Sequence, residues 1–457
     1  MEKIKEKYGL LASISMVVGI VVGTGIFFKA SEVLREVNGN FGLSILAWVI
    51  GGLIMLIMSY NFANIALKYH GMNSMADFAR ATVGHKYGFI VGIFAKYIYF
   101  PAMTATVAFV VGMYFTEACG WKDQSFPFSM PVFLSAFIFL TLLVVTHILA
   151  PIISGKIQVS TTVIKMIPLL LMGIVGIIMG LANHTLIDNV HTDLNITGGK
   201  GFFAAICVTS FANEGWICAT NLGAEMKNGK RNLPIALITG TIIVIIIYLL
   251  YSIGLFGANT SENLMGNPSE AVRGAFANLF GNGVASLLIV VVLISAIGTL
   301  NGLSLANSRS SYALARNNDG LFQEEMCKLT KKSNSPLLSS AVGYVLACLW
   351  LIYYYVSQTN SMAGSVGFPF DSSELPIISA YLLYIPILVM FMVKAKDLNF
   401  FKRYIATSLG VIAALFMIAA SIYRHGINTL YYLIFFIILI GVASLIEYFR
   451  LKKKKAC

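Results

Sequence analysis

Long apolar stretches recur along the chain and alternate with short polar connections. Most of them are at least about twenty residues long, which is the length that an α-helix needs to cross the hydrocarbon core of a bilayer. They predict twelve membrane spans, over residues 8–29, 42–69, 86–117, 130–149, 154–181, 200–225, 233–257, 283–313, 336–356, 371–393, 402–422 and 427–449. Transmembrane β-strands would instead give shorter segments of alternating hydrophobicity. The pattern therefore predicts an all-α integral membrane protein.

Two of these spans are interrupted near their middle by small and polar residues. The first span contains Gly23, Thr24 and Gly25, and the sixth contains the stretch from Ser210 to Trp216. Glycine lacks a Cβ and leaves helical geometry at little cost, and a broken helix exposes unpaired N–H and C=O groups. We therefore expect two discontinuous helices whose breaks bind a ligand near the middle of the membrane.

The two breaks are five spans apart, which indicates a repeated unit. Each unit also has a more polar segment between its second and third spans, at residues 73–84 and 269–280. Because five is odd, the second unit must cross the membrane in the opposite orientation, as in transporters that work by alternating access. We predict one transporter domain, 1–457, with a first five-helix repeat at 8–181, an inverted second repeat at 200–393 and two extra helices at 402–449. A transporter, and not an enzyme, is the expected class.

Composition and charge agree with a membrane protein. Charged residues make up 11% of the chain, against roughly 25% in soluble domains. The net charge of +12 would suggest nucleic acid in a soluble protein, but here the basic residues gather on one side of the membrane. With a cytoplasmic N-terminus, the opposite side holds only Lys29, Arg35, Lys122, Lys200, Arg273 and Arg424. This asymmetry predicts cytoplasmic termini in the cell membrane, with the lipid bilayer and no nucleic acid as partner.

The six cysteines are scattered along the chain, without the paired spacing of a metal site or a disulfide framework. We therefore expect no metal and no cofactor, and we interpret the cysteines as packing residues. Cys119 is the cysteine closest to the connection between the third and fourth spans, but it precedes that loop.

Two ionisable residues lie deep inside predicted spans. Lys165 is too far from either end of the fifth span for its ammonium to reach the membrane surface comfortably, and a buried ammonium is usually functional and partnered. Glu214 belongs to the second break, and two interpretations of it stay open. Its carboxylate is either held by the freed N–H groups of the break, or it couples transport to protons or senses an amine. Burial raises the pKa of a carboxyl group, whereas hydrogen bonds from the freed N–H groups lower it.

Several motifs, in order, resemble the amino acid–polyamine–organocation transporters. They are the breaks at Val22–Phe27 and Phe211–Trp216, Glu225 with the following Lys227–Pro234, and the end of the eighth span at Asn301–Gly320. Phe100-Pro101-Ala102 and Ile157-Gln158 with Lys165 resemble the L-type amino acid transporter branch, and the whole resembles bacterial alanine/serine/cysteine exchangers. The resemblance covers about the first three-quarters of the chain. Glu214 departs from it, because the family often has glycine there.

The resemblance implies a LeuT/APC-like fold of 5+5 inverted repeats with discontinuous helices 1 and 6. A half-helix N-terminus at each break would bind the substrate carboxylate, and unwound carbonyls would bind its ammonium. The predicted substrate-binding residues are Ile20, Val21, Gly23, Thr24, Gly25, Phe211, Ala212, Glu214, Trp216 and Tyr248. Phe211 would be an aromatic lid over the substrate, whereas Trp216 and Tyr248 are open to an interpretation as packing residues.

By the same resemblance, Lys165 reaches the break of the first helix and stands where sodium-coupled relatives hold an ion. Ser295 or Thr299 would be its partner in the eighth span. This predicts a sodium-independent exchanger of small neutral L-amino acids such as alanine and serine. The alternatives are a proton-coupled symporter that uses Glu214, and a cationic amino acid or polyamine carrier. The loop cysteine by which animal members bind a heavy subunit has no convincing equivalent, so no covalent heavy subunit is expected.

Overall fold

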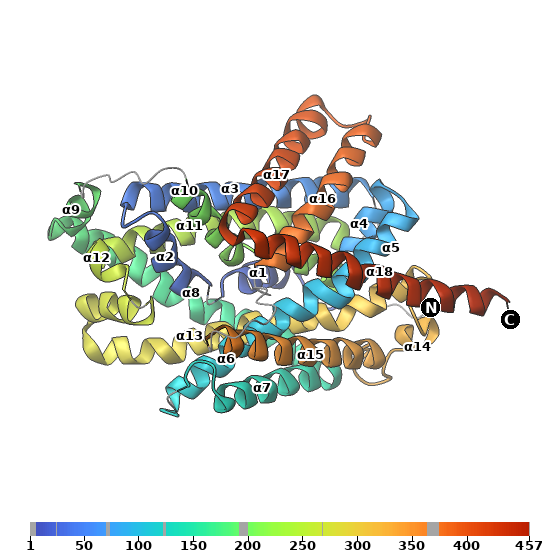
Figure 1. The fold of residues 1–457 in the computed structure, drawn as a ribbon, viewed down its shortest axis with the longest axis horizontal. Helices are drawn as coiled ribbons and strands as arrows, with labels where there is room; N and C mark the ends of the chain where they lie inside the picture. Colours follow the sequence, from blue (N-terminus) through green and yellow to red (C-terminus); the bar gives the residue numbers. More distant parts are fainter. Residues whose placement is uncertain are drawn as a thin grey trace.

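The computed structural model describes residues 6–23, 25–69, 74–121, 125–191, 200–266, 268–362 and 374–456. These residues form a helical bundle without a β-strand (Figure 1). The first half of the chain contains α1 (Leu10–Val21), α2 (Gly25–Glu36), α3 (Phe41–Lys68), α4 (Met75–Thr82), α5 (His85–Phe94), the π-helix η1 (Ala95–Tyr99), α6 (Phe100–Ala118), α7 (Met130–Leu149), α8 (Pro151–Ala182) and α9 (Thr185–His191).

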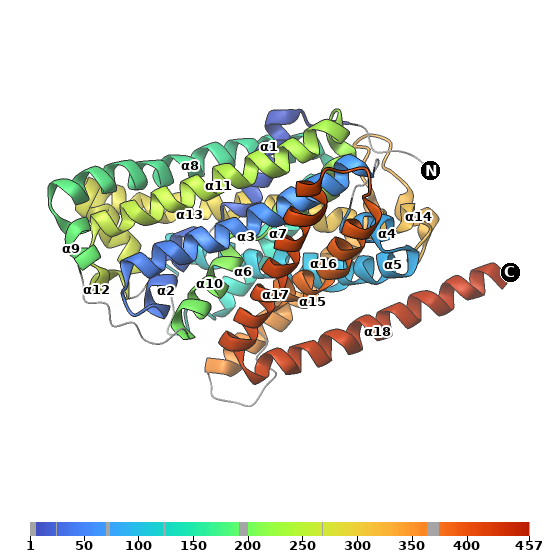
Figure 2. The same cartoon turned by 90° about the horizontal axis from the view of Figure 1, so that it is seen from above.

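The second half of the chain continues the bundle, and both ends of the chain lie at the same end of the molecule (Figures 1 and 2). It contains α10 (Lys200–Ala212), the 3₁₀-helix η2 (Trp216–Glu225), α11 (Gly229–Ala258), α12 (Ser261–Leu264), α13 (Pro268–Arg316), α14 (Gln323–Cys327), α15 (Leu337–Met362), α16 (Leu375–Lys394), the π-helix η3 (Phe401–Ile405), α17 (Ala406–His425) and α18 (Ile427–Ala456).

Eleven helices in the described part of the chain are long and apolar enough to cross a membrane. Each of them corresponds to one predicted span. The span predicted at 8–29 is divided between α1 and α2, which have 12 residues each, so neither reaches that length alone. The count of twelve therefore stays a prediction. The two predicted polar segments correspond to α4 and to the first part of α13, which bends at Gly281 with a φ of 81°.

Helices α8 and α11 contact each other directly through their backbones, side by side along the bundle (Figure 2). A Cβ on Gly254 of α11 would lie 2.6 Å from the Cα of Gly173, and one on Gly257 would lie 2.9 Å from the carbonyl carbon of Gly176. Small residues allow such close packing in membranes, where van der Waals contact holds helices together. The two helices thereby form a fixed pair that carries Lys165 and Tyr248, one on each helix.

The long helix from His85 to Ala118 contains an irregular turn at η1. Pro101 has no N–H to donate to the carbonyl of Tyr97, four residues earlier. The indole Nε1 of Trp350 on α15 instead donates to that carbonyl over 2.8 Å. Single π-helical turns of this kind occur frequently at functional sites, and Tyr99 at the end of this one faces the second break.

Candidate functional site

The first break lies between α1 and α2. Helix α1 ends at Val21, Val22 has an extended backbone with φ −71° and ψ 90°, and α2 begins at Gly25. Thr24 is outside the described residues. The interruption leaves carbonyl groups at the end of α1 without helical partners, so other donors must satisfy them.

The second break lies between α10 and η2. Helix α10 ends at Ala212, and Gly215 precedes η2 with a φ of 102°. Side chains rarely adopt this left-handed conformation, which explains the glycine at this position. Both polar atoms of the Asn213 side chain are buried and have no hydrogen-bond partner among the described residues. The predicted discontinuities of both helices are thus present in the structure.

The two breaks contact each other, although almost two hundred residues separate them. A Cβ on Gly25 would lie 2.9 Å from the Cα of Ala212, so only glycine permits this approach. A Cβ on Gly215 would lie 2.8 Å from the Cγ2 of Ile20. Predicted site residues from both breaks are therefore brought together.

Tyr248 on α11 joins the two breaks by hydrogen bonds. Its hydroxyl lies 2.9 Å from the carbonyl of Val21 and 2.9 Å from the carbonyl of Ala212. A hydroxyl has a single proton to donate, so one of the two carbonyls is without this donor at any moment.

We expect Tyr248→Phe to slow transport about tenfold, because buried carbonyls that lose their donor cost about 1–3 kcal/mol. Tyr251→Phe is the matched control on the same helix, because the buried Tyr251 hydroxyl has no partner in the described part of the chain. Initial transport rates of both variants in reconstituted vesicles check the prediction. Equal rates for the two variants would contradict it.

The ammonium of Lys165 lies at the first break, and its side chain is fully buried. Its Nζ is 2.8 Å from the carbonyl oxygen of Gly19 and 2.5 Å from that of Val22. From α13, it is 3.4 Å from the backbone carbonyl of Ser295 and 3.5 Å from the hydroxyl of Thr299. Both predicted partners from this helix are present, Ser295 through its backbone and Thr299 through its side chain. Lys165 thus satisfies the carbonyls that the break has freed.

Glu214 of the second break receives a hydrogen bond from the hydroxyl of Tyr99, and both residues are buried. The backbone N–H of Gly215 also donates to its carboxylate. This arrangement agrees with a carboxylate held by the break. Tyr99 was not among the predicted site residues. The signal that could have found it is its position directly before Phe100-Pro101-Ala102.

The two aromatic residues of the second break have different surroundings. Phe211 is partly exposed, and the Nζ of Lys29 on α2 lies 5.7 Å from its ring centroid. Trp216 is fully buried, with its ring centroid 5.5 Å from that of Phe62 and 6.2 Å from that of Tyr384. Trp216 therefore has the contacts of a packing residue, whereas Phe211 is partly open on one side.

Two broken helices that meet inside a bundle of membrane helices, with carbonyls and N–H groups freed at their junction, define a membrane transporter site. A family model of amino acid permeases matches residues 8–443. The chain therefore belongs to the amino acid permease family. This confirms the resemblance to amino acid–polyamine–organocation transporters.

Curated relatives of the chain are amino acid transporters. The serine/threonine exchanger SteT of Bacillus subtilis is 27% identical over 99% of this chain and 98% of its own length. The human cystine/glutamate transporter is 24% identical over 93% of this chain and 82% of its own length. The small subunit 2 of the large neutral amino acids transporter from Oryctolagus cuniculus is 23% identical over 82% of this chain and 71% of its own length. The L-type branch is thus represented among them.

The fold is shared with a solved transporter structure. MhsT in complex with L-phenylalanine superposes with a TM-score of 0.62 over 93% of this chain and 100% of the MhsT chain, at 15% identity. At this identity the likeness concerns the fold alone. It confirms the predicted LeuT-like fold, and the chain is a multi-pass membrane protein of an amino acid transporter family.

Proposed function

We propose that the protein is a sodium-independent exchanger of small neutral L-amino acids, such as alanine and serine, that works by alternating access. In this proposal the two repeats are 8–181 and 200–393, the broken helices at their start move relative to the rest of the bundle, and the helices at 402–449 are additional. Both termini are cytoplasmic and the protein lies in the cell membrane. It needs no covalent heavy subunit.

The observation that carries the proposal is the position of the Lys165 ammonium. It is fixed among the oxygens of Gly19, Val22 and Thr299 at the first break. An ammonium that is covalently attached to the chain supplies the positive charge that a sodium ion would otherwise bring to this place. Because it cannot dissociate with the substrate, it offers no ion gradient to couple to, which favours exchange of one substrate for another.

The substrate class follows from the groups at the junction of the breaks. The N–H groups at the start of α2 favour a carboxylate, and the carbonyls of Val21 and Ala212, which share the Tyr248 hydroxyl, favour an ammonium. A zwitterion is therefore bound mainly by backbone groups. Gly25 and Ala212 leave little space between the breaks, which favours a small side chain.

The test uses purified protein in vesicles loaded with unlabelled serine. Uptake of labelled alanine or serine should need the internal amino acid and should not change when sodium is replaced by choline. Full-rate uptake into empty vesicles would overturn the exchange proposal. A requirement for sodium would overturn the role given to Lys165. Stronger competition by lysine or putrescine than by alanine would favour a cationic amino acid carrier.

A second candidate is proton-coupled transport through Glu214, and its buried hydrogen bond with Tyr99 favours it. For the plain exchanger, we expect Glu214→Gln to leave the pH profile of transport unchanged, because the carboxylate then only positions the break. Tyr99→Phe is the matched control, since it removes the hydrogen bond and keeps the carboxylate. Transport rates across a series of external pH values check this. A pH dependence that is lost in Glu214→Gln and kept in Tyr99→Phe would favour proton coupling.

A further inference from the structure

A cluster of charged side chains joins α2, the start of α16 and the end of α17. At its centre is Glu374, whose side chain is fully buried just before α16. One of its carboxylate oxygens lies 3.1 Å from the Nζ of Lys29 on α2. The other lies 3.2 Å from the Nε of Arg424 and 2.9 Å from the Nε2 of His425, both at the end of α17.

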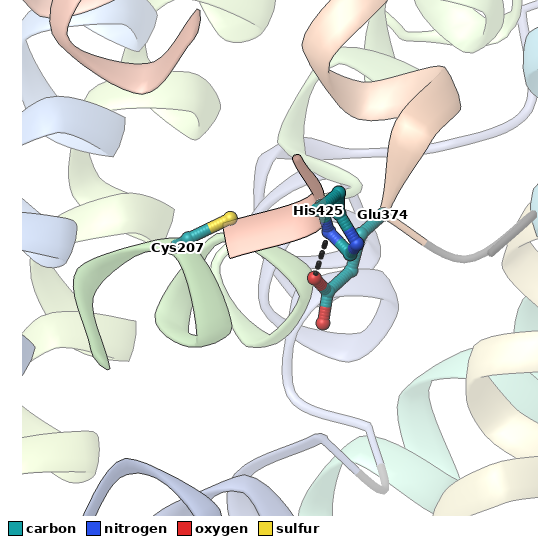
Figure 3. Close-up of side chains that lie close together, drawn as sticks. All are labelled: Cys207, Glu374 and His425. Atoms are coloured by element: carbon teal, nitrogen blue, oxygen red, sulfur yellow. Dashed lines mark hydrogen bonds and ion pairs between the residues drawn. The ribbon is translucent and has the colours of Figure 1, made fainter. Parts of the chain in front are cut away.

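Cys207 of α10 completes a set of metal-binding side chains around Glu374. Its Sγ, an imidazole nitrogen of His425 and a carboxylate oxygen of Glu374 all lie within 4.8 Å of one another. Figure 3 shows the three side chains converging from three separate segments, with the imidazole and carboxylate in contact. Cys207 and Glu374 are buried, and the side chain of His425 is 14% exposed, so the cluster is partly open at His425.

A thiolate, an imidazole and a carboxylate are the ligands that Zn²⁺ prefers. Zinc binds them at about 2.0–2.3 Å in a tetrahedron, so that two ligand atoms on one ion are roughly 3.5 Å apart. The present separations, all within 4.8 Å, therefore exceed the required ones by at most about 1.3 Å. The Nε2 of His425 and the carboxylate already share a proton over 2.9 Å, and a metal ion would take the place of that proton. A water molecule would supply the fourth ligand.

The charge of the cluster also accommodates a divalent cation. Lys29 and Arg424 are paired with the three carboxylates of Glu32, Glu36 and Glu374, which gives a net charge of −1 with a neutral histidine. Binding of Zn²⁺ with loss of the thiol proton would bring the net charge to zero.

We propose that Cys207, Glu374 and His425 form an inhibitory binding site for Zn²⁺ or a similar transition-metal ion. The site would join α10, which leads into the second break, to α16 and α17. A metal ion bound there would hold α10 against α16 and α17. The proposed transport cycle, on which this consequence rests, requires α10 to move, so the bound ion would inhibit transport. The scattered spacing of the cysteines gave no indication of this site, because its three ligands are distant in sequence.

Metal binding is tested on the purified full-length protein with Co²⁺ as a spectroscopic probe. The wild type should give a thiolate charge-transfer band and the intense visible bands of a four-coordinate ion. Cys207→Ser should lose the charge-transfer band, and His425→Gln should weaken binding at least about tenfold. Cys119→Ser is the matched control, because that thiol is exposed and outside the cluster. An unchanged band in Cys207→Ser, or its loss in Cys119→Ser, would overturn the site.

A second measurement needs no variant. X-ray absorption of Zn²⁺ bound to the wild-type protein should show one sulfur together with nitrogen and oxygen ligands, and a shell without sulfur would overturn the proposal. In exchange assays, micromolar Zn²⁺ should slow the wild type and Cys119→Ser at least about fivefold and leave Cys207→Ser unaffected. Equal inhibition of all three would overturn the inhibitory role. Absence of exchange without any metal would instead count against the proposed function, while the spectra still decide the metal site.

Discussion

Replacing Lys165 with alanine is expected to reduce amino acid exchange by at least about a hundredfold. The ammonium is the donor that holds the carbonyls of Gly19 and Val22 at the first break. Each buried carbonyl that is left without a donor costs about 1–3 kcal/mol, and the break would no longer keep the geometry that binds the substrate. The loss should therefore appear in both the apparent affinity and the maximal rate of labelled serine exchange.

The matched control for this variant is Lys156→Ala. Lys156 lies on the same helix, α8, and is exposed, so its loss should leave exchange within about twofold of the wild type. The helix bundle should survive in both variants, because the backbone contacts between α8 and α11 do not involve either lysine. Normal exchange by Lys165→Ala would remove the lysine from the mechanism. Exchange that becomes sodium-dependent in Lys165→Ala would support its role as a fixed substitute for the ion.

The two breaks could be predicted from the sequence because each depends only on residues that are neighbours in the chain. Gly23 and Gly25 interrupt one apolar stretch, and Gly215 follows two polar residues in another. Each glycine therefore marks a point where a helix can end at a low cost in conformational energy. Lys165 could be recognised for a similar reason, since a charge in the middle of an apolar span must have partners. Its partners from α13 were predicted through the family resemblance.

The contacts between distant segments could not be predicted in the same way. Tyr248 was expected at the site, but the sharing of its hydroxyl between Val21 and Ala212 depends on how closely the two breaks approach. Tyr99, which binds Glu214, lies in a π-helical turn, and a hydrophobic pattern does not reveal such a turn. The number of spans was predicted from apolar length, and the span at 8–29 stays a prediction because α1 and α2 are each shorter than a full span.

A second buried cluster of ion pairs joins η2, α13 and the N-terminal segment at the end of the bundle where both termini lie. The carboxylate of Glu225, at the end of η2, lies 2.8 Å from the Nε of Arg309 on α13 and 3.4 Å from the Nζ of Lys7. The backbone N–H of Lys7 donates to the carbonyl of Glu225 over 2.7 Å, so the N-terminal segment is attached to η2 as well. Arg309 and Glu225 are both almost completely buried, and the two terminal nitrogens of Arg309 have no hydrogen-bond partner among the described residues.

We therefore expect Glu225→Ala to lower the free energy of unfolding by about 3–5 kcal/mol, because removal of one member of a buried ion pair leaves the other charge uncompensated. Burial opposes ionisation of Glu225, but Arg309 and then Lys7 outweigh it and hold its pKa below the ordinary value of 4.5. A carboxyl group with a lowered pKa stabilises the fold fully above the pKa of the unfolded chain, and this contribution is lost as the pH falls through the lower, folded value. The wild type should thus lose stability below about pH 4.5 more steeply than Glu225→Ala.

Thermal unfolding of the detergent-solubilised protein at neutral and acidic pH measures both effects. Glu262→Ala is the control, because Glu262 is an exposed carboxylate on α12 and its removal should change the unfolding temperature little. Lys7→Ala should cost less than Glu225→Ala, because the Lys7 side chain is 12% exposed and its bond to the carboxylate is longer. If Glu225→Ala unfolds at the same temperature as Glu262→Ala, the cluster does not fasten this end of the bundle. In alternating access the same contacts between η2, α13 and the N-terminal segment would have to open. A variant that weakens these contacts should therefore also change the ratio of the exchange rates measured from the two sides of the membrane.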